Sequence, residues 1–481
     1  MPAEKITNLL LYVPFNDDNS VDKNVKDLLT EKEFFEKCYL KPNFDKEIEE
    51  IFAKSSDEIE AFEIDITKDE LIRKYERKKS EEEALFNWIN ANENNLYCIK
   101  GDAGTGKTTF LHYLKYKYMK TDLVWNIIDI QRAINSISIL GNDIDIPKFN
   151  SLYNKAISAI IICIKESLFY FDSSNQLIVE ESLKKIERVS SNYKILFEKY
   201  YPNRTVKTFF ENLFKLLNSS EKGRSVCESV GQYCADYFNG LYEMHKGKYN
   251  ILFKVYVELY IFFLRCENLE VRHMIAFDNF ERFIGTEEIY SGQLTEFVGE
   301  LRNIQNSIAE NYPYLSNYYQ ILIFMRNTSV RMFTPLQIAD FFPHYLDLSE
   351  WFQVSKIVEK KIAWYRENNI KIDVTKRLEE ILNDIGGCEN SFRGLRSKLN
   401  MLFNNNKRVI IKFLTKIISS SANKKYLEKY DFFWNNQCNI EPSYARFAAR
   451  TIIFRLVLNE LRSDGFFRHI ITQRSDNEKK V

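Results

Sequence analysis

Short, mainly apolar runs recur through the middle of the chain. Branched and aromatic residues dominate them, and a run that is apolar almost throughout is typical of a strand buried on both faces of a parallel sheet. The five runs are Leu96–Lys100, Asp122–Ile130, Met274–Asp278, Gln320–Met325 and Tyr345–Ser349. Because the intervening segments show helical spacing, the pattern predicts an α/β fold with a parallel sheet.

A long tract with helical spacing separates the second run from the third. From Ile146 to about Cys266, apolar residues recur at intervals of three and four positions, as at Val206, Phe209 and Leu213. We therefore predict a large helical insertion within the part of the chain that forms the sheet.

The patterns divide the chain into four predicted parts. Residues 1–74 look like an N-terminal adaptor of short strands and helices, and residues 75–350 form the core, with the insertion at about 146–266. A helical lid over residues 351–425 and a C-terminal helical segment over residues 426–481 follow it.

Composition indicates a folded, mostly helical protein without a strong overall charge. Only 15 Gly and 9 Pro accompany 37 Phe and 28 Tyr, so tight turns are few and aromatic packing is frequent. Lys+Arg and Asp+Glu number 67 each, so no net positive charge draws the chain to nucleic acid or anionic lipid. Eight cysteines without a C-x-x-C pair and five histidines argue against zinc sites and disulfides.

Two segments bear on localisation. The most apolar long segment, Tyr249–Leu264, carries Lys254 and Glu258 one helical turn apart, which predicts a buried helix and not a membrane span. The start of the chain, Met1–Val13, has few basic residues and a brief apolar run, so it does not resemble a signal peptide. We expect a cytoplasmic protein with reduced thiols and no membrane association.

The first strand runs into a glycine-rich loop that fits the pattern G-x-x-x-x-G-K-[ST]. A predicted amphipathic helix from Lys107 to about Met119 follows, so strand, loop and helix stand in the required order. Glycines let the loop turn its backbone N–H groups inward around a polyphosphate, and the helix start adds a positive dipole end. Phosphate binding is the expected consequence; the alternative is a chance glycine-rich turn.

Each residue of this loop has an expected role in nucleotide binding. Lys107 would reach the β and γ phosphates, and the Thr108 hydroxyl would ligate Mg²⁺. The residues expected to hold the nucleotide are Gly101, Asp102, Ala103, Gly104, Thr105, Gly106, Lys107, Thr108 and Thr109.

An acidic partner for the loop is expected at the end of the third strand. Asp278 would hold the hydration shell of Mg²⁺, and Glu281 or a nearby polar group would orient the attacking water. The alternative is a buried strand capped by a solvated acid.

Two further positions are candidates for contact with the γ phosphate. Arg326 and Asn327 follow the fourth strand, and ligands lie outside the carboxyl ends of strands in such sheets. A plain polar strand exit is the alternative.

Arg408 lies in the first turn of a helix that follows Asn404–Asn406. A positive charge there opposes the helix dipole and indicates a nearby anion. The alternative is a surface arginine.

Together these motifs resemble the AAA+/STAND group of P-loop ATPases. The resemblance covers about residues 75–425 and rests on the phosphate loop, on Phe277–Glu281, on Arg326 with Asn327, and on Phe403–Arg408. It implies a three-layer P-loop NTPase core with strand order 5-1-4-3-2, a helical lid, ATP and Mg²⁺ as ligands, and a homo-oligomer that is a ring or a switch.

The resemblance also implies roles for two arginines and contains one departure. Arg331 would act as a finger toward the neighbouring subunit, and Arg408 would act from the lid. Where AAA+ enzymes usually carry Asp-Glu, this chain has Asp278 and Asn279, which makes slow, switch-like hydrolysis credible. The chain further resembles the ATPase subunits of bacterial anti-phage systems, including the RADAR type, which works with an adenosine deaminase. An effector enzyme subunit is thus an implied partner.

Two classes of function are compatible with these residues. The first is an ATP-hydrolysing, nucleotide-controlled oligomeric sensor or scaffold in anti-phage defence. The second is a DNA-binding or DNA-remodelling ATPase of the initiator or loader kind, with the C-terminal helices as its DNA-binding module. The neutral net charge counts against the second class.

Overall fold

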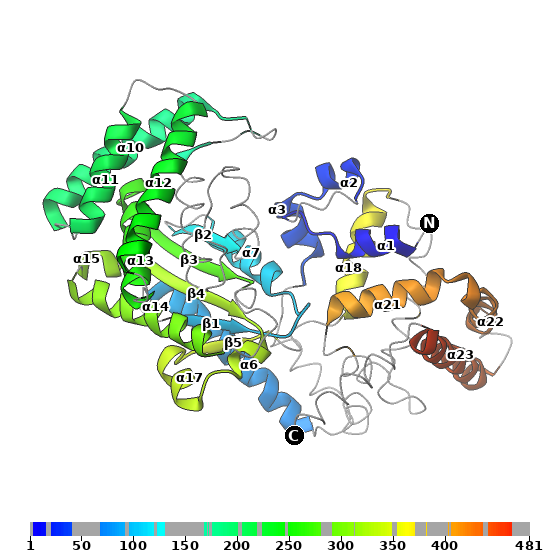
Figure 1. Cartoon of the computed structure of the whole chain (residues 1–481). Helices are drawn as coiled ribbons and strands as arrows, with labels where there is room; N and C mark the ends of the chain where they lie inside the picture. Colours follow the sequence, from blue (N-terminus) through cyan, green and yellow to red (C-terminus); the bar gives the residue numbers. More distant parts are fainter. Residues whose placement is uncertain are drawn as a thin grey trace. The chain divides into compact units, whose positions relative to one another are not determined.

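A computed structural model of the chain describes the following residues (Figure 1): 3–15, 21–40, 68–91, 96–119, 123–129, 168–170, 172, 176–200, 204–218, 224–245, 249–279, 291–311, 313–348, 354–370, 381, 403, 406–435 and 441–463. They form two compact units. The helical unit comprises Met1–Lys79, Asp102–Thr109 and Leu348–Val481, and the sheet unit comprises Ser80–Gly101 and Phe110–Asp347.

The sheet unit is built on five parallel strands, in the order β2-β3-β4-β1-β5. Counted from the other edge, this is the order 5-1-4-3-2 that the resemblance implies. The strands are β1 (Tyr97–Lys100), β2 (Leu123–Asp129), β3 (Arg272–Asp278), β4 (Tyr319–Met325) and β5 (Tyr345–Asp347). All five predicted strands are confirmed, with ends that move by one or two residues.

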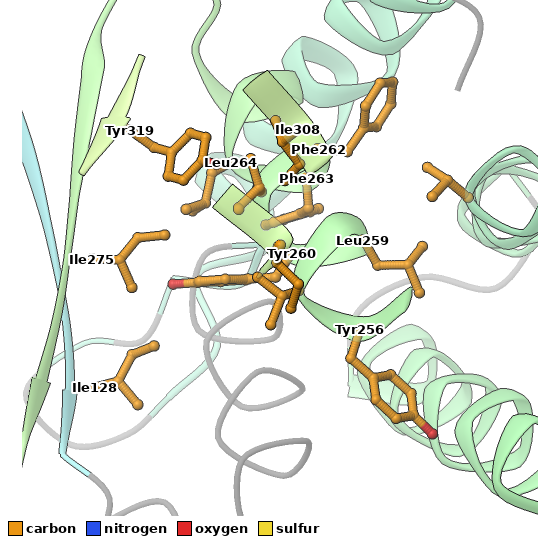
Figure 2. Close-up of a cluster of buried hydrophobic side chains, with 14 of the residues drawn as sticks. Ile128, Tyr256, Leu259, Tyr260, Phe262, Phe263, Leu264, Ile275, Ile308 and Tyr319 are labelled. Atoms are coloured by element: carbon orange, nitrogen blue, oxygen red, sulfur yellow. The ribbon is translucent and has the colours of Figure 1, made fainter. Parts of the chain in front are cut away.

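One face of the sheet packs on α13 (Tyr249–Glu267) and α14 (Ser291–Asn311). Figure 2 shows Ile128 of β2 and Ile275 of β3 pointing toward Tyr260 of α13. Side chains alternate along each strand, so every second residue of β4, from Tyr319 to Met325, reaches this apolar core, and Phe277 of β3 does so as well.

The opposite face packs on α6 (Lys68–Ala91). The Trp88 ring lies 5.1 Å from the ring of Tyr97 in β1, and Gln320 Nε2 of β4 donates to the Trp88 carbonyl at 2.8 Å. The helix α7 (Lys107–Lys117) lies beside α6, because the Lys117 ammonium covers the Phe86 ring. Helices therefore cover both faces, which accounts for strands such as β4 that are buried at every position.

The predicted insertion is mostly helical in its described part, since residues 179–200, 204–217, 224–244 and 249–267 form helices. Its helices are α10 (Val179–Tyr200), α11 (Arg204–Leu217), α12 (Arg224–Met244) and α13 (Figure 1). The apolar stripe of α11 is buried at Val206, Phe209 and Leu213, as its periodicity predicts. Residues 146–167 of this prediction lie outside the described residues. Among the described helices, α13 included, none is both long and apolar enough to cross a bilayer.

Shorter helices follow β3 and β4 in the sheet unit. They are α15 (Pro313–Ser316), α16 (Asn327–Val330) and α17 (Pro335–Phe341). Thr334 and Gln337 form a reciprocal capping box at the start of α17, which fixes where that helix begins.

The helical unit combines helices from the N-terminal and C-terminal parts of the sequence. Its elements are α1 (Ala3–Leu11), α2 (Lys23–Leu28), α3 (Glu31–Glu33), the π-helix η1 (Phe34–Cys38), α18 (Val354–Glu367), α21 (Lys407–Ser419), the 3₁₀ helix η5 (Ser421–Asn423), α22 (Lys424–Asn435) and α23 (Pro442–Ser463). The described part of the predicted N-terminal adaptor, residues 3–15, 21–40 and 68–74, is helical and contains no strand.

The first helix packs against two helices of the predicted lid. The hydroxyl oxygens of Thr7 in α1 and Thr415 in α21 lie 2.6 Å apart and share a hydrogen bond. The Lys361 ammonium of α18 donates to the carbonyls of Leu10 and Tyr12, at 2.7 and 2.5 Å. Those carbonyls stand at the end of α1, where helical carbonyls lack partners within the helix. The N-terminal residues thus share one core with α18 and α21.

Candidate functional site

The glycine-rich loop starts at the carboxyl edge of the sheet. β1 ends at Lys100, and the next backbone N–H, that of Gly101, donates to the Met325 carbonyl of β4 at 3.2 Å. The chain then enters α7 at Lys107. The order of strand, loop and helix that the sequence predicts is therefore present.

Two glycines give the loop a backbone that other residues rarely adopt. Gly104 has a φ of +76° and Gly106 a φ of +99°. A Cβ added to Gly104 would also overlap the side-chain amide of Asn406, whereas a Cβ on Gly106 would meet nothing within 4 Å. Left-handed residues in such turns direct successive N–H groups to one side and create an anion-binding concavity. Ala103 sits between Asp102 and this pair, and is half-buried.

The loop closes on the carbonyl of Asp102. That oxygen accepts from the Thr105 N–H at 3.3 Å, from the Thr105 hydroxyl at 3.0 Å and from the Lys107 ammonium at 3.1 Å. Thr105 is fully buried and Lys107 is 9% exposed. The ammonium is thus held against the loop. Thr108 and Thr109 follow in the first turn of α7 and are half-buried.

The start of α21 packs onto this loop. Asn406 caps the helix, since its Oδ1 accepts from the Val409 N–H at 3.2 Å, and its side chain lies against Gly104. The Lys407 ammonium donates to the Thr105 carbonyl at 3.2 Å. The predicted helix start is confirmed, and two of its side chains contact the loop.

Lys407, and not Arg408, is the basic residue that reaches the loop. Lys407 is buried, and burial, followed by the nearby positive charge of Lys78, lowers its pKa to about 7. Arg408 is exposed. Sequence reasoning singled out Arg408 and missed Lys407, although the same signal, a basic residue just after an asparagine cap, applies to both.

Asp278 ends β3 and is 2% exposed. Its register partner on the neighbouring strand is Asp129, the last residue of β2. Asn279 follows with a φ of +55°, and its Nδ2 donates to Asp129 Oδ2 at 3.2 Å. Sequence reasoning missed Asp129, although it ends its strand as Asp278 ends β3. Glu281 lies outside the described residues.

The exit of β4 carries the predicted phosphate-sensing pair. Arg326 is the N-cap residue of α16, and its carbonyl accepts from the N–H groups of Ser329 and Val330, both at 3.0 Å. Arg326 and Asn327 are half-buried, and Arg331, at the end of α16, is exposed.

The strand order brings these strand ends to one edge of the sheet. Reading across β2, β3, β4 and β1, that edge carries Asp129, Asp278, Arg326 and Gly101 in turn. Ligands of open parallel sheets bind outside this edge.

The residues present fit a nucleotide and its magnesium ion. Backbone N–H groups, a buried lysine and a helix start suit a polyphosphate, and Mg²⁺ is usually held by one or two carboxylates together with substrate phosphates. Within the described ranges, no three His, Cys, Asp or Glu side chains converge on a point where they could hold a metal ion.

Comparisons of the chain with protein-family models, curated proteins and solved structures found no match. The described residues form an α/β protein with an all-parallel, five-stranded sheet and a largely helical remainder.

Proposed function

We propose that the protein binds ATP with Mg²⁺ and hydrolyses it, as a P-loop ATPase of the AAA+/STAND type. The observation that carries the proposal is the loop between β1 and α7. It combines positive φ angles at Gly104 and Gly106 with a lysine, Lys107, whose ammonium folds onto the loop backbone. Such a loop suits a bound polyphosphate because it offers N–H donors and a positive charge together.

Each loop group would make a distinct contact with the nucleotide. The N–H groups of residues 101–109 and the start of α7 would bind the phosphate oxygens, and Lys107 would neutralise the β and γ phosphates. Thr108 and Asp278 would hold Mg²⁺ and its water shell. Arg326 and Asn327 would meet the γ phosphate from the end of β4.

Control of an assembly by the nucleotide is the role that best accounts for the helical unit. Its helix α21 holds the loop through Asn406 and Lys407 and also packs on α1 through Thr415. A nucleotide that reshapes the loop would therefore act on a helix that the N-terminal residues also contact. The resemblance extends this to a cytoplasmic homo-oligomer that senses infection in bacterial anti-phage defence and works with an effector enzyme subunit.

The binding of MgATP by the protein tests the proposal. Isothermal titration should show one site, and Lys107→Ala should weaken binding at least ~10-fold, since a charge-assisted contact contributes roughly 1.5–3 kcal/mol. Lys115→Ala is the matched control, because it removes a lysine from the same helix. Unchanged affinity in a folded Lys107→Ala variant would refute the site. Salt-dependent DNA binding by the same preparation would favour the initiator-like alternative.

A further inference from the structure

A P-loop ATPase needs a group that orients the water attacking the γ phosphorus, and this chain lacks the usual glutamate beside Asp278. Asn279 stands at that position. An amide is a far weaker proton acceptor than a carboxylate, so Asn279 cannot do the same work itself.

The structure shows what the Asn279 amide contacts. Its Nδ2 donates to Asp129 Oδ2 at 3.2 Å, across 150 positions of sequence. The backbone of Asn279 is left-handed, with a φ of +55°, a conformation that asparagine tolerates better than most residues. The contact therefore joins a side chain just after β3 to the last side chain of β2.

Asp129 and Asp278 also lie on the same face of the sheet. They are register partners on adjacent parallel strands. The residues just before them, Ile128 and Phe277, belong to the apolar core on the α13 face. Because side chains alternate along a strand, Asp129 and Asp278 lie on the other face, the one that packs on α6 at β1 and β4.

We infer that Asp129 is the carboxylate that orients the attacking water, and that Asn279 is a positioning residue that holds it. The acid that β3 lacks is supplied by β2. This inference rests on the proposed ATPase function and names a further catalytic group within that site.

The step balances with water as the only co-reactant. The water oxygen forms a bond to the γ phosphorus while the bond from that phosphorus to the β–γ bridging oxygen breaks, and ADP leaves with that electron pair. Asp129 accepts a proton from the water and passes it to the released phosphate or to solvent.

The test measures kcat and the MgATP dissociation constant separately. Asp129→Asn should lower kcat by ~10²–10⁴-fold, the usual contribution of a general base, while MgATP binding changes less than ~3-fold. Asp340→Asn on α17 is the control for loss of a surface acid, since Asp340 is 62% exposed. Its turnover should match that of the unaltered protein.

Two variants of Asn279 separate positioning from structural support. Asn279→Gly keeps the left-handed backbone without strain and removes the amide, so kcat should fall while the melting temperature changes little. A double variant, Asp129→Asn with Asn279→Glu, exchanges the acid and the amide. The carboxylate then follows β3 and the amide ends β2. This double variant should regain much of the turnover that Asp129→Asn loses.

The outcomes distinguish the two proposals. If the protein binds no MgATP, or binds it independently of Lys107, the proposed function fails. If binding depends on Lys107 but no hydrolysis exceeds that of the Lys107→Ala variant, or Asp129→Asn turns over normally, the inference about Asp129 is overturned and the nucleotide site stands. Loss of MgATP binding in a folded Asp129→Asn variant would also overturn it, because that carboxylate would then be a ligand for the metal.

Discussion

The Lys407 ammonium lies 3.2 Å from the Thr105 carbonyl oxygen, although 302 positions of sequence separate the two residues. Thr105 is fully buried and Lys407 nearly so. We therefore expect Lys407 to brace the loop through the Thr105 carbonyl, while Lys107 meets the nucleotide.

Replacing Lys407 should loosen the loop without removing a nucleotide ligand. Lys407→Met keeps the apolar stem and deletes one hydrogen bond, whose net contribution is about 0.5–1.5 kcal/mol. MgATP affinity measured by titration should fall ~2–10-fold. Arg408→Met is the matched variant on the next residue; it should leave affinity unchanged and lower kcat only if Arg408 acts as the lid arginine. Equal affinity in the Lys407→Met variant and the unaltered protein would contradict the bracing role.

The two glycines of the loop should differ in their tolerance of alanine. Alanine at Gly106 suffers only from the positive φ, which costs roughly 1–2 kcal/mol. Alanine at Gly104 suffers the same strain and also displaces Asn406, whose cap on Val409 contributes ~1 kcal/mol. Thermal unfolding should therefore show a larger loss of stability for Gly104→Ala. A reversed order would show that Asn406 does not pack against the loop.

Buried lysines should make the helical unit more stable at alkaline pH. Burial lowers the pKa of Lys407 to about 7 and that of Lys361 to about 8, from an ordinary value of 10.5. At a pH between the lowered pKa and the ordinary pKa of 10.5, each lysine is protonated in the unfolded chain and largely neutral in the folded one. The free energy of unfolding therefore rises with pH from about 7 toward 10.5. Urea titrations at pH 7, 8 and 9 measure this slope.

The control for this pH dependence is Lys407→Met. It removes one of the two lysines, so it should reduce the slope without abolishing it. A Lys407→Met variant with the same slope as the unaltered protein would show that Lys407 stays charged in the folded state, in contact with a group that offsets its burial.

The sheet was predictable because each strand has a recognisable local sequence pattern. A run such as Gln320–Met325 has the composition of a doubly buried strand, and the loop before Lys107 has a fixed spacing of glycines and lysine. Neither signal depends on distant residues. The strand order followed from the resemblance, and the pairing of the strands confirms it.

The contacts around the loop were less predictable, because they depend on orientation and on long-range packing. Adjacent helical residues point about 100° apart, so the sequence does not tell whether Lys407 or Arg408 faces inward. The partnership of Asp129 with Asn279 spans the entire insertion. Thr7 and Thr415 pack together although 408 positions of sequence separate them, and no local pattern signals this contact.

The position of Arg331 leads to a prediction about assembly. Arg331 is exposed at the end of α16, the short helix that follows β4 and the candidate phosphate sensors Arg326 and Asn327. A P-loop core leaves the γ phosphate partly solvated, and an arginine from a neighbouring subunit can stabilise the charge that grows there, with an effect of ~10³–10⁵-fold on rate. We predict that MgATP organises an oligomer whose sites use Arg331 from the adjacent subunit.

Mixing two inactive variants distinguishes a residue that acts across subunits from one that acts within its own. Arg331→Ala keeps an intact loop and lacks the finger, whereas Lys107→Ala keeps the finger and lacks the loop lysine. A mixed oligomer contains some sites with both groups, so the mixture should regain part of the ATPase activity that each variant lacks alone. An Arg408→Ala defect should not be rescued by Lys107→Ala, because a lid arginine acts on the loop of its own chain. A protein that remains monomeric at micromolar concentration with MgATP bound, yet hydrolyses ATP at its full rate, would rule out the shared site.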